Sequence, residues 1–248
     1  MSNQRRLRLI LSAVAAAACL TGCGQQQNSP DAEPPKRLTT EQAQALAVLR
    51  FNNFSAGRVP LTIEAHGAVT LRASVVVDFR AGAAYGDYTT SEPGSSEPLT
   101  SGVIAWSTDQ VGTASGTADG AVPAATAWTQ RPMDASQPTD VALALALQLG
   151  ADRPENPVLL QQSGARLLRV EGKGDDTVYV MSGPGRAAAD GSPGAAASSR
   201  TTYWVDRTGH LVRFEAQIGG GDPATFTVDD GEPAAIPGKV LRFLRRTS

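Results

Sequence analysis

The chain has 248 residues, with 22 Lys or Arg and 24 Asp or Glu, and a formal net charge of −2. Residues 1–22 contain three of the arginines and no acid, so removing them leaves 19 basic and 24 acidic residues. This acidic balance, without basic clusters, argues against nucleic acid as a partner, and the roughly 210 residues beyond position 37 are enough for one domain with a sizeable core.

Residues 1–22 are typical of a bacterial signal peptide. Residues 5–8 carry three arginines, and residues 9–20 form an apolar run of 12 residues. This run is too short to span about 30 Å of hydrocarbon as a helix. Residues 20–23 (LTGC) match the bacterial lipobox pattern. The match implies that Cys23 is acylated, that the chain is cleaved before it, and that acyl chains anchor the protein to the extracytoplasmic face of the cell membrane.

Two points about this segment stay open. Cys23 is alternatively a chance cysteine at the end of a cleaved signal or in a buried amino-terminal helix. The arginine pair at 5–6 permits export by either the Sec or the twin-arginine route. Cys19 and Cys23 are the two cysteines of the chain, so the domain beyond them has no thiol for a disulfide, a nucleophile or a metal site.

A polar tether and a helix are expected next. Residues 23–37, beginning at the lipidated cysteine, are polar and contain prolines, which predicts a flexible tether. Residues 38–248 are expected to form a single domain. Thr39 and Gln42 have the spacing of a capping box. Apolar residues then recur at helical spacing as far as Phe54, so an amphipathic helix of about 14 residues is predicted to end at residues 55–57.

Residues 59–79 have the clearest pattern in the chain. Apolar and polar residues alternate through 59–65 and again through 69–79, on either side of a turn near Gly67. A period of two places the apolar residues on one face, so we expect a long antiparallel hairpin with one buried and one solvated face. Shorter strands are expected at 83–88, 102–108 and 125–132, with polar loops at 89–99 and 112–123.

Residues 141–149 (VALALALQL) are apolar almost throughout. Their leucines alternate at a period of two, which formally fits a strand. Alanine and leucine favour helices, however, and Thr139, Asp140 and Gly150 are typical of helix ends, so we expect a helix with Thr139 or Asp140 as its cap. A helix that is apolar on every face must be buried on every face or must cover an apolar cavity.

The last third of the chain returns mainly to strands. Its expected elements are a short helix at 155–162, a hairpin of strands at 165–170 and 177–181, a low-complexity loop at 182–200, and strands at 201–205, 211–218, 224–228 and 239–244, with a turn at 206–209. The whole pattern predicts an α+β fold with an antiparallel sheet of about ten strands.

No catalytic or metal-binding arrangement and no cofactor are expected. Beyond Cys23 the chain has no G-x-S-x-G motif, and its two histidines, His66 and His210, are expected in solvent. Acidic residues at 175–176 and 229–232 are expected to be solvated turn acids rather than a calcium site. Basic residues near the carboxyl end are either a charged strand end that discourages edge pairing or a contact for anionic headgroups. They are Lys239, Arg242, Arg245 and Arg246.

Residues 203–214 (YWVDRTGHLVRF) are the most specific stretch of the domain. Together with the lipobox, the tether, the first helix, the long hairpin and the central apolar helix, they resemble the LolA-like lipid-carrier lipoproteins of actinobacterial envelopes, the LppX/LprG type. The resemblance covers most of residues 38–230. It implies a strongly curved antiparallel sheet, an incomplete barrel, with helices packed on its concave face. It also implies a cavity between sheet and helices that carries acylated lipids or glycolipids, and it brings no catalytic residue.

Two functions follow as hypotheses, neither of them enzymatic. In the first, the chain is a membrane-anchored lipoprotein that binds or carries a lipid or acylated ligand in a hydrophobic cavity. In the second, it is an envelope interaction or assembly module with a filled core and an unknown protein partner. An envelope hydrolase with His66 or His210 as its base is the weakest alternative. The residues expected to line the cavity, for each of which ordinary core packing is the alternative, are Leu46, Phe54, Leu71, Val75, Phe79, Leu143 and Leu147.

Overall fold

The alternation in residues 59–79 builds the middle of the fold. In this computed structural model, which describes residues 34–185 and 199–245, β2 (Arg58–His66) and β3 (Thr70–Asp78) pair antiparallel along their whole length. Buried residues alternate with more exposed ones along most of both strands, and the turn lies at residues 67–69. The predicted hairpin is therefore confirmed.

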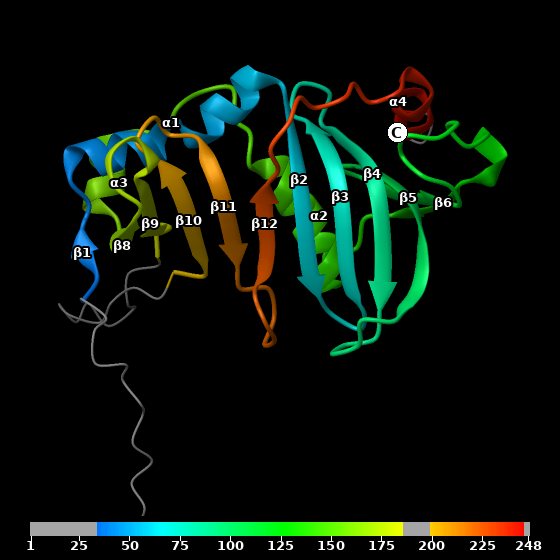
Figure 1. Cartoon of the computed structure of the whole chain (residues 1–248), viewed down its shortest axis with the longest axis horizontal. Helices are drawn as coiled ribbons and strands as arrows, with labels where there is room; N and C mark the ends of the chain where they lie inside the picture. Colours follow the sequence, from blue (N-terminus) through cyan, green and yellow to red (C-terminus); the bar gives the residue numbers. More distant parts are fainter. Residues whose placement is uncertain (1–33, 186–198, 246–248) are drawn as a thin grey trace, which may run out of the picture. The chain divides into compact units, whose positions relative to one another are not determined.

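The sheet that contains this hairpin has twelve strands among the described residues. The other strands are β1 (Lys36–Arg37), β4 (Ala83–Ser91), β5 (Pro98–Ser107), β6 (Gln110–Ala114), β7 (Thr129–Pro132), β8 (Arg166–Glu171), β9 (Val178–Ser182), β10 (Thr201–Asp206), β11 (Leu211–Ala216) and β12 (Ala224–Val228). Their order is β1-β8-β9-β10-β11-β12-β2-β3-β4-β5-β6-β7, and every neighbouring pair is antiparallel. The sheet is curved and open, as Figure 1 shows, so the predicted α+β class is confirmed.

Helices cover both faces of this sheet. The α-helices of the described residues are α1 (Thr40–Ala56), α2 (Pro138–Gln148), α3 (Pro157–Gln162) and α4 (Gly238–Arg245). The first three lie on the concave face, where α2 contacts β2, β3 and β5, and α1 contacts α3 and β10 (Figure 1). Helix α4 contacts β4 and β5 from the opposite face. The predicted packing of helices on the concave face is confirmed, and α4 adds a layer that was not predicted.

Helix α1 begins where the capping box predicts. The Oγ1 of Thr39 accepts a hydrogen bond from the N–H of Gln42 at 3.3 Å, and Gln42 Oε1 accepts one from the N–H of Thr39 at 3.0 Å. The helix continues for 17 residues, slightly longer than predicted, and ends at Ala56 with Gly57 as its C-cap. The capping box at the amino-terminal end thus pairs two backbone N–H groups that have no partner within the helix.

Helix α2 confirms the preference for helix over strand in this segment, but not its predicted cap. The N-cap residue is Gln137, which makes no side-chain capping bond, and Pro138 occupies the first turn. Proline fits this position because its missing N–H would have no partner in the helix. Asp140, which was expected as a cap, accepts hydrogen bonds from Arg131, nine residues earlier in the chain, instead.

Alternate residues of β4 and β5 belong to two different cores. Ala84, Ile104 and Trp106 face the concave side and join the main core, which also contains the buried residues of α1 and α2. The residues between them face α4 in a smaller second core; they are Ala83, Tyr85, Val103 and Ala105. A strand buried on both faces has a continuous apolar run instead of an alternating one, as residues 103–106 (VIAW) do.

Several predicted boundaries and one predicted element are wrong. Residues 89–91 and 98–99 were expected in a loop but belong to β4 and β5, and β6 likewise extends into the next expected loop. Their side chains are mostly polar and not typical of strands, so this backbone pairing was not predicted. Of the strand expected at 125–132, only β7 is a strand, and residues 125–127 form a short 3-10 helix. The expected strand at 239–244 is helix α4, in which Val240 and Leu244, one helical turn apart, are both buried.

The amino-terminal boundary also differs from the prediction. Lys36 and Arg37 pair with β8, so the sheet begins two residues before Leu38, where the domain was expected to start. The predicted signal peptide, the lipidation of Cys23 and most of the predicted tether and of the 182–200 loop lie outside the described residues. Within residues 34–185 and 199–245, no helix has the length and apolar character needed to cross a membrane.

Candidate functional site

All seven residues predicted to line a ligand cavity belong to one apolar cluster. Those buried in it are Leu46, Leu71, Val75, Phe79 and Leu143, and those partly buried against it are Phe54 and Leu147. The cluster therefore joins α1, the β3 region of the sheet and α2, as the sequence predicted. Whether these side chains contact a ligand stays a prediction.

Helix α2 fills the space over the middle of the concave face. Its inner side chains Ala142, Leu143 and Ala146 are no more than 1% exposed, and the helix contacts β2, β3 and β5. On its outer side, Leu145 and Leu147 are half-buried. The expected ligand space is thus occupied by the side chains of α2 in this conformation, and a ligand would enter it only if α2 moved.

A buried ion pair fixes the amino-terminal end of α2. The side chain of Asp140 is completely buried, whereas that of Arg131 on β7 is 50% exposed. Arg131 donates two hydrogen bonds to the carboxylate, of which the one from Nη2 to Oδ1 is 2.7 Å long. The N–H of Asp134 donates a third bond to Oδ2 at 2.8 Å. The Asp140 carboxylate raises the pKa of Arg131 above its ordinary value, since it stabilises the charged guanidinium.

The backbone carbonyl groups of α2 are bound by side chains of neighbouring elements. The completely buried Trp106 of β5 donates its Nε1–H to the carbonyl of Leu143 at 2.9 Å. At the carboxyl end, Asn53 and Arg50 of α1 donate to the carbonyl groups of residues 149 and 148, at 2.9 and 2.8 Å. The last carbonyl groups of a helix have no partner within it, so these bonds attach the end of α2 to α1.

A surface depression lies beside the ion pair. Its volume is about 700 Å³, and Arg131, Met133, Asp134 and Gln137 are among the residues that line it. Met133 also packs against the main core. The segment that leads from β7 into α2 thus connects an open depression with the apolar cluster beneath the helix.

Two further cavities lie away from α2. One of about 390 Å³ is bounded by α4 and residues 122–128, and one of about 290 Å³ is lined by residues of β2, β3 and β4 and by residues 234–237. Of the seven predicted residues, Val75 lines the last of these, and the other six line none of the three cavities. Trp106 and Asn53 were not predicted to bind α2, because they lie 37 and 96 residues from the residues whose carbonyl groups they contact. Arg131 is only nine residues from Asp140, but Asp140 was expected to cap the helix, so the ion pair was not predicted either.

The two histidines belong to separate hairpins. Nε2 of His66 lies 3.7 Å from Oε1 of Glu64, and Nδ1 of His210 lies 2.7 Å from the hydroxyl of Thr208. Asp175 and Asp176 belong to a short 3-10 turn, as expected for turn acids. Among the described residues, no three His, Cys, Asp or Glu side chains are grouped in a way that would hold a metal ion.

Comparison with known proteins adds the following findings. No protein-family model and no curated protein matches the sequence. Among solved structures, the chain is similar to an uncharacterized conserved protein of Thermus thermophilus, with 13% identity and a TM-score of 0.36 over 78% of this chain and 88% of that one. It is also similar to a proposed outer membrane lipoprotein-sorting protein domain of Vibrio parahaemolyticus, with 9% identity and a TM-score of 0.21 over 76% of this chain and 92% of that one. Likenesses at this level carry no argument about function.

Proposed function

We propose that the chain is a membrane-anchored extracytoplasmic lipoprotein that binds a lipid or acylated ligand between α2 and the concave face of the sheet. The observation that carries the proposal is the environment of α2. This helix is apolar on its inner and outer sides, lies over an apolar sheet, and is attached by a few polar contacts. An acyl chain placed under it would exchange one apolar neighbour for another.

The inner side of α2 favours such an exchange. Ala142 and Ala146 present small side chains to the sheet, so only Leu143 is deeply inserted from the middle of the helix. The outer side already tolerates water, since Leu145 and Leu147 are half-buried. A helix with these properties is suited to act as a lid, because its movement breaks few interlocking side-chain contacts.

The cost of opening α2 can be compared with the free energy gained when an acyl chain is buried beneath it. Loosening α2 costs the half-exposed Arg131–Asp140 pair, about 2–3 kcal/mol, and about 1 kcal/mol for each of three hydrogen bonds to its carbonyl groups, or about 5–6 kcal/mol together. A chain of about 16 carbons gains about 12 kcal/mol on burial, and one of about eight carbons gains about 6 kcal/mol. Burial of a long acyl chain therefore clearly exceeds the cost of opening, whereas burial of a short one only matches it and leaves no net gain for binding.

The membrane attachment is supported by the sequence. Residues 20–23 match the lipobox, and the described part of the chain has no thiol that would compete with Cys23 for acylation. The first strand of the described residues, β1, lies at one edge of the sheet. Residues 24–33 leave enough polar chain to separate this edge from a membrane surface.

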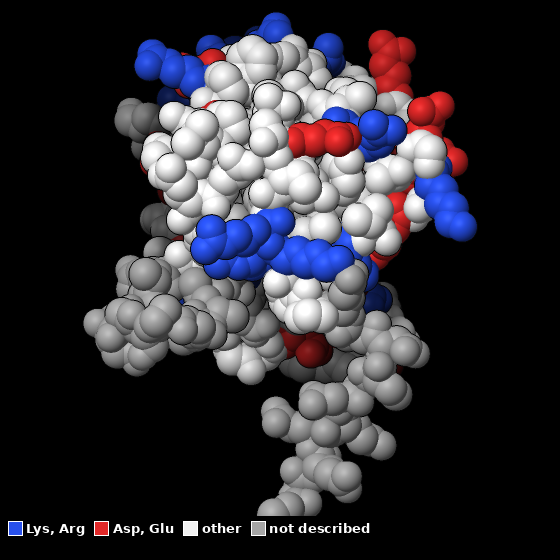
Figure 2. All heavy atoms as spheres, turned by 90° about the vertical axis from the view of Figure 1, so that its left-hand side faces the viewer, with Lys and Arg blue, Asp and Glu red and all other residues white. Residues whose placement is uncertain are grey.

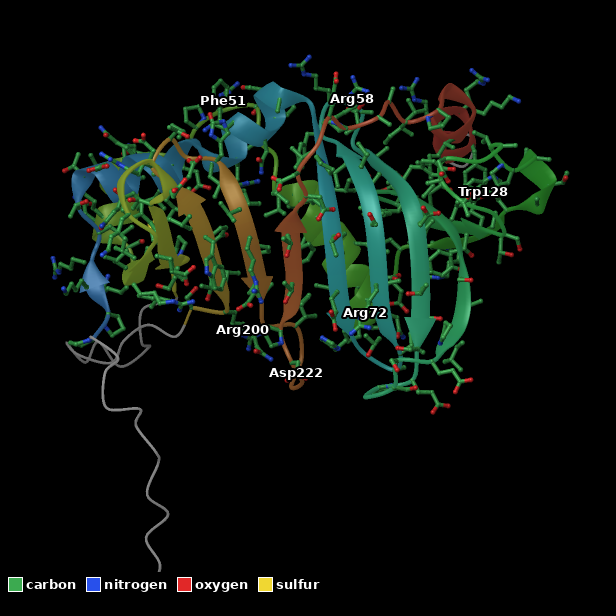
Figure 3. The ribbon with its side chains drawn as sticks, viewed as in Figure 1. Phe51, Arg58, Arg72, Trp128, Arg200 and Asp222 are labelled. Carbon is green, nitrogen blue, oxygen red and sulfur yellow. The ribbon has the colours of Figure 1, made fainter. Side chains whose placement is uncertain are left out.

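A titration with fluorescent acyl-chain probes tests the proposal. The chain without residues 1–32, which lie outside the compact unit 33–248, should bind a probe of about 16 carbons and not one of about eight. Arg131→Gln should bind the long probe at least about tenfold more tightly, because it lowers the cost of opening α2 by about 2–3 kcal/mol. Arg72→Gln is the control, since Arg72 also pairs with one carboxylate, at 3.1 Å, on the other side of the sheet (Figure 3). Absence of binding, or equal binding by both variants, would contradict the proposal.

A second candidate is an interaction module with a filled core. It is favoured by apolar side chains that are exposed on α3, where Val158 and Leu159 are 54% and 62% exposed. Figure 2 views the end of the molecule where α3 lies, and uncharged side chains cover much of its upper part. If the acyl probes do not bind, replacement of both residues by Ser should abolish capture of an envelope protein, and unchanged capture would exclude this surface.

A further inference from the structure

A cavity on the convex face, between α4 and residues 122–128, has the composition of an anion site with an apolar floor. Its volume is about 390 Å³. Trp128 and Phe243 form its apolar floor, and Lys239 and Arg242 of α4 also line it. It lies on the side of the sheet opposite α2, so neither the α2 ion pair nor the main core takes part in it.

The aromatic floor is held in place by the sheet. The rings of Trp128 and Phe243 stack with centroids 4.8 Å apart and an angle of 24° between their planes. Both rings lie over Gly112 of β6, where a Cβ would come within 2.6 Å of Phe243 Cε1 and 3.2 Å of Trp128 Cε3. Glycine at this position leaves the room that the stacked rings occupy. Figure 3 shows Trp128 beside α4.

The two cations are positioned by the buried side of α4. Val240 and Leu244 are buried in the second core, and the side chain of Gln110 donates a hydrogen bond to the carbonyl of Leu244. These contacts fix the rotation of the helix. Lys239 and Arg242, three residues apart on its other side, are exposed and therefore neighbours on the helix surface.

Neither cation has an acidic partner among residues 34–185 and 199–245. Within the described residues, no Asp or Glu oxygen lies within 4.0 Å of the side-chain nitrogens of Lys239 or Arg242. The cavity lining contains no acid either. Two adjacent unpaired cations are notable in a chain that is acidic overall, because their mutual repulsion would favour an anion between them.

We propose that this cavity binds a phosphate ester. The fork of N–H groups on Arg242 matches two phosphate oxygens, and Lys239 supplies a second charge that is free to adjust its direction. The stacked rings provide an apolar surface for the carbon atoms next to the phosphate. The phosphate belongs either to an anionic lipid headgroup at a membrane surface or to a soluble phosphate compound. Binding at this site does not require α2 to move, so its test does not depend on the proposed function.

The test uses the full chain reconstituted into phosphatidylcholine vesicles, with or without about 30% phosphatidylglycerol. The emission of Trp128, taken as the difference between the chain and its Trp128→Phe variant, reports on the cavity. Inorganic phosphate is then titrated into the phosphatidylcholine sample. The test variant is Lys239→Gln/Arg242→Gln, and the matched control is Arg153→Gln/Lys173→Gln, which removes two exposed charges that have no ion pair in the described structure.

The emission of Trp128 should change with phosphatidylglycerol or with inorganic phosphate. The test variant should need about tenfold more anion for the same change, and the control should differ from the original chain by less than about twofold. A change with phosphatidylglycerol alone assigns a lipid headgroup, and a change with inorganic phosphate assigns a soluble phosphate compound as well. No change with either, or an equal loss in both double variants, would overturn the proposal.

Discussion

The contact between Arg131 and Asp140 allows a quantitative prediction about α2. Replacing Arg131 with Gln leaves the carboxylate of Asp140 completely buried, with the N–H of Asp134 as its remaining donor. Breaking a buried ion pair from one side costs about 3–5 kcal/mol. Because the side chain of Arg131 is 50% exposed, solvent screening reduces this to about 2–3 kcal/mol.

This loss corresponds to a fall of about 5–10 °C in Tm for a domain of this size. Urea unfolding followed by Trp fluorescence should give the same free energy, since Trp106 lies against α2. Arg72→Gln, which breaks an exposed pair, should cost less than about 1 kcal/mol. Adding Asp140→Asn to Arg131→Gln should recover part of the stability, because no unpaired charge is then buried. Equal stability of the two arginine variants, or no recovery in the double variant, would refute the assigned role of this ion pair.

Three further predictions concern other parts of the chain. Gly209→Ala should lower the free energy of unfolding by more than about 2 kcal/mol, because φ is +85° there and a Cβ would lie 2.4 Å from a methyl carbon of Val48. Gly221→Ala, where a Cβ would have no atom within 4 Å, should leave thermal unfolding unchanged. Burial raises the pKa of Asp206, but hydrogen bonds donated within residues 206–210 outweigh this and hold the pKa below its ordinary 3.8. The ionised carboxylate therefore stabilises the folded state above about pH 4, and this stabilisation is lost as the pH falls further. The loss of unfolding free energy caused by Asp206→Asn, measured by urea unfolding, should therefore be smaller at pH 3 than at pH 7. An equal loss at both pH values would contradict this. Cys23→Ser should move the protein from the membrane fraction to the soluble fraction, and unchanged fractionation would argue against the lipobox.

The parts of the fold that were predicted correctly have a strong local signal. The β2–β3 hairpin alternates at a period of two over most of its length, and Thr39 with Gln42 defines the start of α1 within a single turn. Both patterns are set by residues that are close in sequence. Such local preferences are reliable predictors when the tertiary contacts favour the same secondary structure, as they do here.

The parts that were missed depend on contacts between distant residues. Helix α4 is only eight residues long, and its helical period becomes evident once Val240 and Leu244 meet the outer face of β4 and β5. The same holds for the candidate site: the seven apolar residues were predicted together, but the hydrogen bond from Trp106 to the carbonyl of Leu143 joins residues 37 positions apart. A residue type alone does not indicate which distant side chain it will bind.

Native mass spectrometry tests the central proposal, the binding of an acylated ligand under α2, most directly. The protein is exported by a bacterial host with a cleavable signal in place of residues 1–33, and is purified without detergent. We expect a population with the added mass of one acyl-bearing molecule, which is lost when Leu143, 1% exposed on the inner side of α2, is replaced by Trp. Recovery of the polypeptide mass alone, under conditions that preserve a known lipid complex, would contradict it.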